Sequence, residues 1–593
     1  MSSFSFPDAV IAVESWLDGA GNAFATKVAR SQSARTLEWN LDLKSLGYPA
    51  GFVRVVVGSL FPALPCELFV DPDLCLQLPH IEEDGRVCLG EASQPHDFND
   101  PVGAVKRALE RFKAELLELS SNKAWCEAQF HKERLSYWSR FCYLRQKSPR
   151  GRPRPRVSLA SVPPVETWAE GDVAAFIPKG SRHRRIRTQV ITGNEADPAE
   201  LAARHGFDNG TVVRGSALFI RLPIELPWTP STWPRTFLDL EMLVQSTTGG
   251  EKSVAAWLQS CGWHDKSPGA TERLRKANLP EGTKPLVVVL CHGQEQYGYQ
   301  ISQSTVSMVT TPHAAPIKLV RIDPAWSLTR DQDLAAFTQR KQKTVLVLGA
   351  GSLGSPVIES LARSGIGTLH IVDSQLFEAP NISRHSLGMS SVLQGKATAL
   401  ATRLQKEIPG LQIKGFGADA RTWSAQHCQP GTYDLVLDLT AESAVRSFLA
   451  HTRNKLFGDT VVIHAWVEHF CAAFHVVATT AALPWPSDDP AGDQVNVADY
   501  SAASSRVQLP ACSDGFHPYG SADIVQAAGF AAERILTVVD DGIAESTVWS
   551  FVRTQSFFDT LGMPIKTRKI VPNQGGPRDG VMLTRSMADV LKN

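Results

Sequence analysis

Apolar positions in the first 145 residues follow the order helix, strand, strand, helix. Apolar residues between positions 10 and 17 stand three or four apart, which predicts a short amphipathic helix. The runs 36–43 and 52–57 are typical of strands, and a Pro-punctuated turn follows them. Between 102 and 119 the helical spacing returns, directly after Pro101, a residue that favours the first turn of a helix. These elements predict a small α+β domain.

The carboxyl-terminal half has a different pattern. The apolar run 345–348 meets Gly349, Gly351 and Gly354, a helical pattern follows, and a second apolar run ends at Asp373. This order predicts a strand, a glycine loop, a helix and a strand. Glycines let the backbone approach a phosphate, the helix N-terminus offers free N–H groups, and the carboxylate can bind ribose hydroxyls. Taken alone, the pattern indicates an NAD site.

The region between these halves is less strongly patterned. Residues 147–156 interleave five cations with three prolines, which predicts a solvated linker, with contact to a partner or a nucleic acid as the alternative. Beyond it, 217–222 and 286–290 predict strands and 252–259 predicts a helix. We therefore expect an α/β multidomain protein, with domains at 1–145, 161–335 and 336–593 and a basic, Pro-rich linker at 146–160.

Composition narrows the possible partners. A chain of 593 residues is too long to form a single hydrophobic core. Lys plus Arg equals Asp plus Glu at 60 each, so no net charge favours binding to nucleic acid or to an anionic membrane. No signal sequence opens the chain, and no run approaches the roughly 20 apolar residues that span a bilayer, so a cytoplasmic protein is expected. Ten cysteines without a CxxC pair argue against a disulfide framework and against structural zinc.

Polar residues beyond the glycine loop favour ATP over NAD. Asn381, Arg384 and Lys396 follow it, and the apolar run 433–437 ends at Asp438. Two cations near a phosphate loop can neutralise a triphosphate, and a carboxylate at the end of a strand can hold Mg²⁺. Hydride transfer has no need for this set of residues.

The segments GAGSLGSPV, IVD, NISRH and DLT resemble the adenylation domain of the ubiquitin-activating, ThiF and MoeB family, over residues 340–540. The resemblance implies a Rossmann-like domain with Mg²⁺ on Asp438 and with Arg384 and Lys396 acting on the phosphates. Its ATP-binding residues would be Gly349, Gly351, Gly354, Asp373, Asn381, Arg384, Lys396 and Asp438. Many relatives carry a two-CxxC zinc site that this chain lacks, so no zinc is expected. The family pairs as dimers and often borrows an arginine, here Arg330 or Arg340.

Cys88 follows an Asp-Gly turn in the segment LPHIEEDGRVCLGE. A cysteine just past a surface turn can be an accessible nucleophile, whereas a free cysteine is otherwise often a half-buried apolar residue. PHI…DGRVCL, with FPALP before it, resembles the active-site region of ubiquitin-conjugating enzymes over residues 30–120, which implies that Cys88 is catalytic. That family usually has His-Pro-Asn where this chain has Leu-Pro-His. His80 therefore either replaces the asparagine as a donor or only holds the loop.

A second candidate nucleophile, Cys512, follows a Pro-, Ser- and Asp-rich crossing over 482–508 and precedes a helical pattern at 522–538. A structureless connection of this length is uncommon in a compact domain and is usually functional or mobile. In the adenylation family the thioester-forming cysteine has a comparable place, which implies that role for Cys512, with a structural thiol as the alternative. Cys471 and Cys291 are better explained by packing.

A conjugating-type domain ahead of an activating-type domain resembles the fusion protein of bacterial CBASS anti-phage operons. The resemblance implies an ATP-dependent transferase that adenylates a partner's C-terminus and passes it through Cys512 and Cys88 to a target lysine. The implied donor is a cGAS/DncV-like nucleotidyltransferase, with a JAB-family peptidase that reverses the linkage and a homodimer as the assembly. No nucleic acid or membrane is expected as a partner.

Three other functions stay open on the sequence. The chain could be a ThiF/MoeB-type adenylyltransferase for a sulfur carrier, whose first domain only docks partners. It could be a scaffold without chemistry, although a scaffold does not need Arg384, Lys396, Asp438 and both cysteines together. An NAD oxidoreductase is the remaining alternative.

Overall fold

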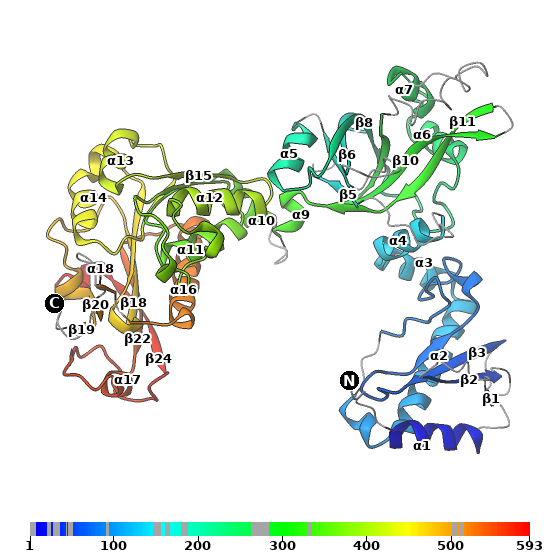
Figure 1. Cartoon of the computed structure of the whole chain (residues 1–593), viewed down its shortest axis with the longest axis horizontal. Helices are drawn as coiled ribbons and strands as arrows, with labels where there is room; N and C mark the ends of the chain where they lie inside the picture. The colour runs from blue at the N-terminus through cyan, green and yellow to red at the C-terminus, as the bar shows by residue number, and fades with distance from the viewer. Residues whose placement is uncertain are drawn as a thin grey trace. The chain divides into compact units, whose positions relative to one another are not determined.

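The structure is a computed structural model that describes residues 7–19, 25–27, 36–42, 44, 51–90, 94–145, 156–160, 166–178, 188–193, 195–262, 284–306, 309–329, 334–500, 507–508, 515–516 and 518–592. The chain divides into two units, Met1–Glu200 with Asp208–Val320, and Leu201–Phe207 with Arg321–Asn593. Each unit contains a sheet with helices packed on it, which confirms the predicted α/β multidomain class (Figure 1).

The first unit begins with an antiparallel sheet in the order β1–β2–β3–β4. Its elements are α1 (Pro7–Asp18), β1 (Ala25–Lys27), β2 (Thr36–Asp42), β3 (Phe52–Gly58), β4 (Glu67–Phe69), η1 (Pro72–Leu74), η2 (Pro95–Phe98) and α2 (Pro101–Ser121). Val13 and Leu17 of α1 and Phe112 of α2 share one core with the strands. Pro101 lies in the first turn of α2, and Asp100 caps that turn. The predicted helix, strand, strand, helix order is confirmed.

The unit continues with an eight-stranded mixed sheet in the order β11–β10–β9–β8–β6–β7–β5–β12. Its elements are β5 (Arg156–Leu159), β6 (Trp168–Ile177), β7 (Thr188–Gly193), β8 (Thr211–Leu222), α6 (Phe237–Thr247), α7 (Val254–Ser260), β9 (Leu286–His292), β10 (Glu295–Val306), β11 (Val309–Ile317) and β12 (Leu319–Arg321). Helix α5 (Pro198–Arg204), between β7 and β8 in sequence, belongs to the second unit from Leu201 onward. The linker expected through residue 160 is therefore wrong at its end, because Val157 and Leu159 are buried in this sheet's core.

Two helices, α3 (Lys123–Lys132) and α4 (Arg134–Arg145), follow α2, and α4 contacts β11 of this second sheet. Tyr137, Trp138 and Phe141 of α4 are buried in the same core as Leu218 of β8 and Leu290 of β9. The Trp138 indole N–H also donates to the Ile317 carbonyl at 3.1 Å. Helix α4 therefore belongs to the core of the middle sheet, whereas α1, α2 and β2–β4 have a core of their own.

The second unit is built on the sheet β15–β14–β13–β16–β17–β18–β22–β24. The first five strands run parallel, and the last three are antiparallel additions. Its helices are α9 (Pro324–Ser327), α10 (Leu334–Gln342), α11 (Gly354–Arg363), η4 (Ala379–Asn381), η5 (Met389–Ser391), α12 (Lys396–Glu407), α13 (Ala420–His427), α14 (Ser443–Leu456), η6 (His469–Cys471), η7 (Ala491–Val495), α16 (Ser521–Asp541), α17 (Gln555–Thr560) and α18 (Met587–Val590). Its strands are β13 (Thr344–Leu348), β14 (Thr368–Val372), β15 (Gln412–Phe416), β16 (Leu435–Asp438), β17 (Val461–Val467), β18 (Ala473–Thr479), β19 (Ala498–Asp499), β20 (Val507–Gln508), β21 (Gly515–Phe516), β22 (Thr547–Arg553), β23 (Lys566–Thr567) and β24 (Gly580–Ser586).

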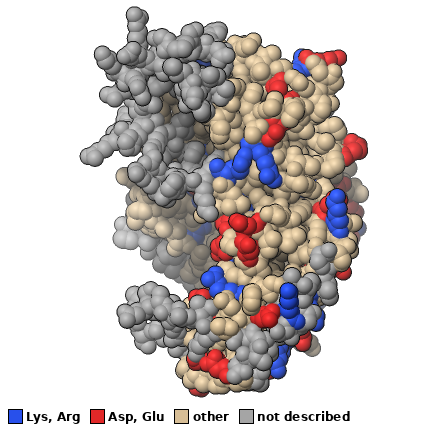
Figure 2. Space-filling model, turned by 90° about the vertical axis from the view of Figure 1, so that its right-hand side faces the viewer, with Lys and Arg blue, Asp and Glu red and all other residues tan. Residues whose placement is uncertain are grey.

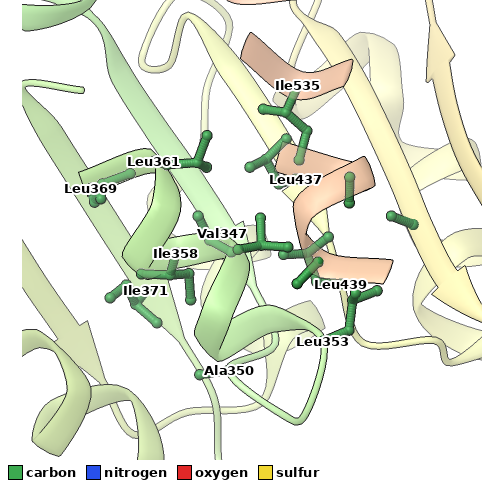
Figure 3. Close-up of a cluster of buried hydrophobic side chains, with 14 of the residues drawn as sticks. Val347, Ala350, Leu353, Ile358, Leu361, Leu369, Ile371, Leu437, Leu439 and Ile535 are labelled. Carbon is green, nitrogen blue, oxygen red and sulfur yellow. The ribbon is translucent and has the colours of Figure 1, made fainter. Parts of the chain in front are cut away.

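Helices cover both faces of this sheet because its central strand is apolar on both sides. Val347 of β13 packs with Ile358 and Leu361 of α11 and with Ile535 of α16, as Figure 3 shows. The alternate residue Leu348 belongs to a second core, which α13 and α14 complete. These two layers fix the ends of β13 and β16 at one edge of the sheet.

The first part of the predicted crossing is packed rather than structureless. Trp485, Val495 and Val497 are all less than 4% exposed. The Asp489 carboxylate pairs with the buried Arg446 guanidinium at 2.8 Å, and β19 pairs with β23. The expectation of a structureless connection is therefore wrong over residues 482–500, and the residues around Cys512 lie outside those that the structure describes.

The visible surface carries both signs of charge. In Figure 2, small groups of Lys or Arg and of Asp or Glu are interspersed among other residues on the described part of this face, and neither sign dominates it. This distribution agrees with the balanced composition. Within the described residues, no helix is both long enough and apolar enough to cross a membrane.

Candidate active sites

Gly349, directly after β13, starts the loop 349–354, which we call the glycine loop. Its φ is +94°, and its N–H donates to the Val372 carbonyl at 2.8 Å. A Cβ at this position would lie 2.9 Å from the main-chain carbonyl carbon of Leu439, so glycine is required here. Because β13 lies between β14 and β16, the loop stands where the strand order reverses, which is where doubly wound sheets bind ligands.

The other two glycines of the loop have different surroundings. A Cβ on Gly354 would lie 2.2 Å from the Gly349 carbonyl oxygen, so this residue allows α11 to begin against the turn. A Cβ on Gly351 would meet no atom within 4 Å. Gly351 thus leaves open space beside main chain at a helix N-terminus, which fits the approach of a phosphate.

Asp373 lies directly after β14 and is bound to the glycine loop. One carboxylate oxygen accepts the Ala350 N–H at 2.8 Å, and the other accepts the Gln375 N–H at 2.8 Å. The carboxylate is half-buried and keeps further lone pairs. It is therefore placed at the strand end where the sequence predicts ribose binding.

Lys396 is the first residue of α12 and is only 6% exposed. Its Nζ donates to the Gln375 side-chain oxygen at 2.6 Å. Burial lowers the pKa of Lys396, and the nearby carboxylates of Asp373 and Glu378 oppose that shift. The structure therefore brings this predicted cation together with Asp373 beside the glycine loop.

The segment NISRH forms the next wall of this site. The Asn381 side-chain oxygen accepts the Glu378 N–H at 3.0 Å, so it shapes the turn η4. The Arg384 guanidinium lies over the Tyr519 ring, 4.9 Å from its centre. Both residues line the same region, but only Arg384 belongs to an open pocket of about 470 Å³, formed by Pro380, Ser383, Arg384, Pro518, Tyr519 and Gly520.

Tyr519 was not identified from the sequence. Its hydroxyl lies 2.8 Å from the Ser352 hydroxyl in the glycine loop, across 167 positions of sequence. It lies two residues before α16, and no periodicity marks it, so only the tertiary structure shows its place. Through Tyr519, the segment that follows Cys512 in sequence reaches the predicted nucleotide site.

His385 was also missed, although it stands in the NISRH motif. Its Nδ1 accepts the Leu387 N–H at 3.0 Å, so the proton belongs on Nε2, which donates to the Ala350 carbonyl at 2.6 Å. Burial lowers the pKa of His385 to about 4. A neutral His385 therefore ties the NISRH segment to the glycine loop.

The lowered pKa of His385 predicts that the carboxyl-terminal domain loses stability in acid. The folded chain keeps His385 neutral down to about pH 4, whereas the unfolded chain binds a proton below its ordinary pKa of 6.5. The stabilisation is complete above pH 6.5 and is lost as the pH falls toward 4. Thermal melts across that range should show a steeper acid loss for the wild type than for His385→Gln, and parallel pH profiles would contradict this assignment.

Asp438, the predicted Mg²⁺ ligand, is 1% exposed at the end of β16. One of its oxygens pairs with His464 Nδ1 at 2.9 Å, and the other accepts the Thr440 hydroxyl at 2.6 Å. Among the described residues, no group of three or more His, Cys, Asp or Glu side chains forms a metal site. A carboxylate fits Mg²⁺, which proteins commonly hold through one or two carboxylates and substrate phosphates. Mg²⁺ on Asp438 stays a prediction.

Cys88 lies in a hairpin in the first unit. The turn at Gly85, with φ +87°, returns the chain so that Ile81 bridges Val87, and the Cys88 N–H donates to the His80 carbonyl at 2.7 Å. The Cys88 side chain is neither buried nor fully exposed. Cys88 is thus held on a short hairpin, in a partly exposed position.

The remaining candidates have different places. Cys512 and Arg330 lie outside the described residues. Arg340 binds Asp540 of its own chain through Nε at 2.8 Å and Nη2 at 2.5 Å, so its guanidinium is committed there. Cys471 is fully buried, and burial raises its thiol pKa to about 12, which confirms that it is a core residue. Cys291 is buried as well.

Comparison with known proteins assigns the two halves of the chain to families. Residues 330–560 match the model of the ThiF family, and residues 13–143 match that of prokaryotic E2 family B. The chain is 24% identical over 510 residues to the ATP-dependent ubiquitin transferase-like protein Cap2 of Pseudomonas aeruginosa (strain BWHPSA011 / Pa011), a match that covers 80% of this chain and 82% of that protein.

Other similarities cover the activating half. The probable adenylyltransferase/sulfurtransferase MoeZ of Mycobacterium tuberculosis (strain CDC 1551 / Oshkosh) is 26% identical over 273 residues, which are 43% of this chain and 65% of MoeZ. A crystal structure of E. coli MccB with AMPCPP and MccA matches 38% of this chain and 68% of that chain, at 13% identity and a TM-score of 0.28. The two family matches and the length of the Cap2 match confirm that the chain is a fusion of an activating ThiF-family domain with a conjugating E2-family domain, an enzyme of the kind that bacterial CBASS anti-phage operons encode.

Proposed function

We propose that this enzyme joins the C-terminal carboxylate of a partner protein to lysine amines. The carboxylate attacks the α-phosphorus of ATP, pyrophosphate leaves, and an acyl-adenylate forms. The Cys512 thiolate then attacks the acyl carbon and AMP leaves. The Cys88 thiolate displaces the Cys512 thiolate, and a lysine amine displaces the Cys88 thiolate to give an amide. Each step divides a difficult amide synthesis into easier ones.

The contact of Tyr519 with the glycine loop is the main support for this proposal. Tyr519 is tied to Ser352 at 2.8 Å and lies against Arg384. Cys512 stands seven positions earlier in the chain, and seven extended residues span at most about 25 Å. A tether of this length would allow the Cys512 thiol to reach an acyl-adenylate at the glycine loop.

The nucleotide site would act by positioning and by neutralising charge. We assign the phosphates to the glycine loop, Lys396 and Arg384, and the ribose to Asp373. Asn381 would shape this wall of the site. Bound Mg²⁺, which we place on Asp438, would neutralise negative charge on the triphosphate.

The proposal also names the acyl donor and the partner proteins. The ThiF and E2 domains in one chain, together with the likeness to Cap2 over 80% of the length, support a protein substrate whose C-terminus is activated. We propose a cGAS/DncV-like nucleotidyltransferase as that substrate, with its attachment priming anti-phage signalling. A JAB-family peptidase would remove it, and the chain would act in the cytoplasm as a homodimer.

A thioester trap tests the relay. The protein is incubated with MgATP and a nucleotidyltransferase that ends in a free carboxylate, and adducts are measured by intact mass with and without reductant. The same reaction is run with Cys88→Ala and Cys512→Ala. We expect a reductant-sensitive adduct on Cys88 that disappears in Cys512→Ala, and an adduct on Cys512 that persists in Cys88→Ala.

Other outcomes would change the proposal. An adduct on Cys512 with none on Cys88 in the wild type would remove the second half of the relay. ATP–pyrophosphate exchange without any adduct would mean that the relay is absent. No exchange with this donor would refute the choice of donor.

The second candidate function is an adenylyltransferase for a sulfur carrier, in which the first domain only docks partners. The 26% identity to MoeZ over 43% of this chain favours it. Under this alternative, Cys88→Ala would retain full product formation. The position of Cys88, which is not buried, at a hairpin that resembles a conjugating active site favours the transferase instead.

A further inference from the structure

A hydrogen-bonded chain leads from helix α4 to Cys88. The His80 N–H donates to the Tyr137 hydroxyl oxygen at 2.9 Å, and the Cys88 N–H donates to the His80 carbonyl at 2.7 Å. Both polar groups of the His80 peptide backbone are therefore used, one toward α4 and one toward Cys88. Tyr137 stands 57 positions away from His80 in the sequence.

His80 has a backbone conformation that needs support. Its φ is +62°, in the left-handed region that residues other than glycine seldom occupy, and such residues persist only where their surroundings hold them. The Tyr137 hydroxyl bonds the N–H of this strained residue. The strain lies next to a proposed nucleophile, where a fixed backbone sets the direction of the Cys88 side chain.

Tyr137 itself is rigidly held. Its side chain is fully buried, its ring meets the Phe130 ring edge-on at 4.8 Å, and the Arg140 guanidinium lies 5.1 Å from the ring centre. Burial raises the pKa of Tyr137 to about 12, so the hydroxyl stays protonated. Its oxygen accepts from His80, and its own proton has no acceptor among the described residues.

The next residue of α4 is bound to the middle sheet. The Trp138 indole N–H donates to the Ile317 carbonyl at 3.1 Å. Its ring meets Tyr297 and Tyr299 edge-on, at 5.1 Å and 5.4 Å between ring centres. Adjacent residues of one helix thus face the Cys88 hairpin and the core of the middle sheet.

We propose that Tyr137 is a positioning residue of the Cys88 site and that the middle sheet holds it in place through α4. The hydroxyl fixes the left-handed backbone of His80, which in turn orients the Cys88 backbone. This assignment gives the middle domain a role in the conjugating reaction. Its effect on acyl transfer rests on the proposed function, but its effect on the Cys88 thiol does not.

The first test compares Tyr137→Phe with Tyr299→Phe in the full chain. Both variants remove one buried hydroxyl from the same core, but the Tyr299 hydroxyl donates to the Pro234 carbonyl at 3.0 Å, within the middle domain. Two rates are measured: alkylation of Cys88 by iodoacetamide, followed on the Cys88 peptide by mass spectrometry, and discharge of a Cys88 thioester to free lysine. Melting temperatures and Cys512 thioester formation are recorded in parallel.

Tyr137→Phe should slow both Cys88 rates about tenfold, because small misplacement of a reacting group is costly. It should leave Cys512 thioester formation unchanged, and Tyr299→Phe should leave both Cys88 rates unchanged. Wild-type rates in Tyr137→Phe, or equal losses in both variants, would overturn the proposal. If the wild type forms no thioester on Cys88, the proposed function fails, while the alkylation rates still decide the role of Tyr137.

A second test uses the strained backbone directly. Glycine adopts the left-handed conformation without penalty, so His80→Gly should make the Tyr137 hydroxyl less important. In the His80→Gly background, adding Tyr137→Phe should change the Cys88 alkylation rate by less than about twofold, which is a coupling between the two sites. Fully independent effects of the two substitutions would refute action through His80.

Discussion

Replacing Lys396 by methionine should lower ATP–pyrophosphate exchange by about 10²–10³-fold, the usual cost of removing one preorganised charge from a reacting site. Methionine keeps most of the apolar stem of a side chain that is 6% exposed, so packing should survive. What is lost is the ammonium that the structure holds beside Asp373 at the glycine loop.

Lys414→Met is the matched control, since Lys414 is exposed on β15 of the same sheet. It should retain wild-type exchange and a wild-type melting temperature. An exchange rate in Lys396→Met within about tenfold of the control would mean that this lysine does not act on the phosphates. A parallel loss of melting temperature in Lys396→Met would instead indicate that the ammonium stabilises the fold.

Replacing Glu468 by alanine should destabilise the carboxyl-terminal domain by about 3–5 kcal/mol, the typical cost of breaking a buried polar network. Glu468 is 3% exposed and accepts from His475 at 2.7 Å, the Val497 N–H at 2.6 Å and the Tyr500 hydroxyl at 2.9 Å. All three donors would lose their acceptor in a buried place. The neighbouring turn at Phe470 and Cys471 has φ of 62° and 52° and depends on the same surroundings.

This substitution should also separate two steps of the reaction. Val497 and Tyr500 belong to the crossing that leads to Cys512, so Glu468→Ala should increase hydrogen exchange over 496–500 and slow thioester formation more than pyrophosphate exchange. Glu468→Gln keeps one acceptor and should cost about 1–3 kcal/mol. The exposed Glu407→Ala should have little effect. Unchanged hydrogen exchange over 496–500 in Glu468→Ala would contradict this account.

Much of the activating site was predictable because its chemistry restricts the backbone. Gly349 needs a positive φ and a close approach to Leu439, and no other residue supplies both, so the requirement is visible in the sequence. The apolar runs of β13 and β14 are equally clear, since strands buried on both faces must be apolar throughout. The strand ends then place Asp373 and Asp438.

The features that escaped prediction depend on contacts between distant segments. Tyr137 reaches His80 across 57 positions and Tyr519 reaches Ser352 across 167, and no local spacing encodes either pair. The crossing looked structureless because Trp485 stands alone among prolines and aspartates without periodicity. It is nevertheless buried, since a single large side chain can anchor a segment that forms little regular structure.

The core shared by α4 and the middle sheet determines which piece of this protein can be exchanged between relatives. A fragment ending at residue 145 would uncover Trp138 and Phe141, which are 2% and 3% exposed in the intact unit. Recombination at that point would separate α4 from the middle sheet that buries it and would expose an apolar surface prone to aggregation. The part that can be transplanted with the Cys88 hairpin intact is therefore the first unit, Met1–Glu200 with Asp208–Val320, rather than a fragment that ends at residue 145.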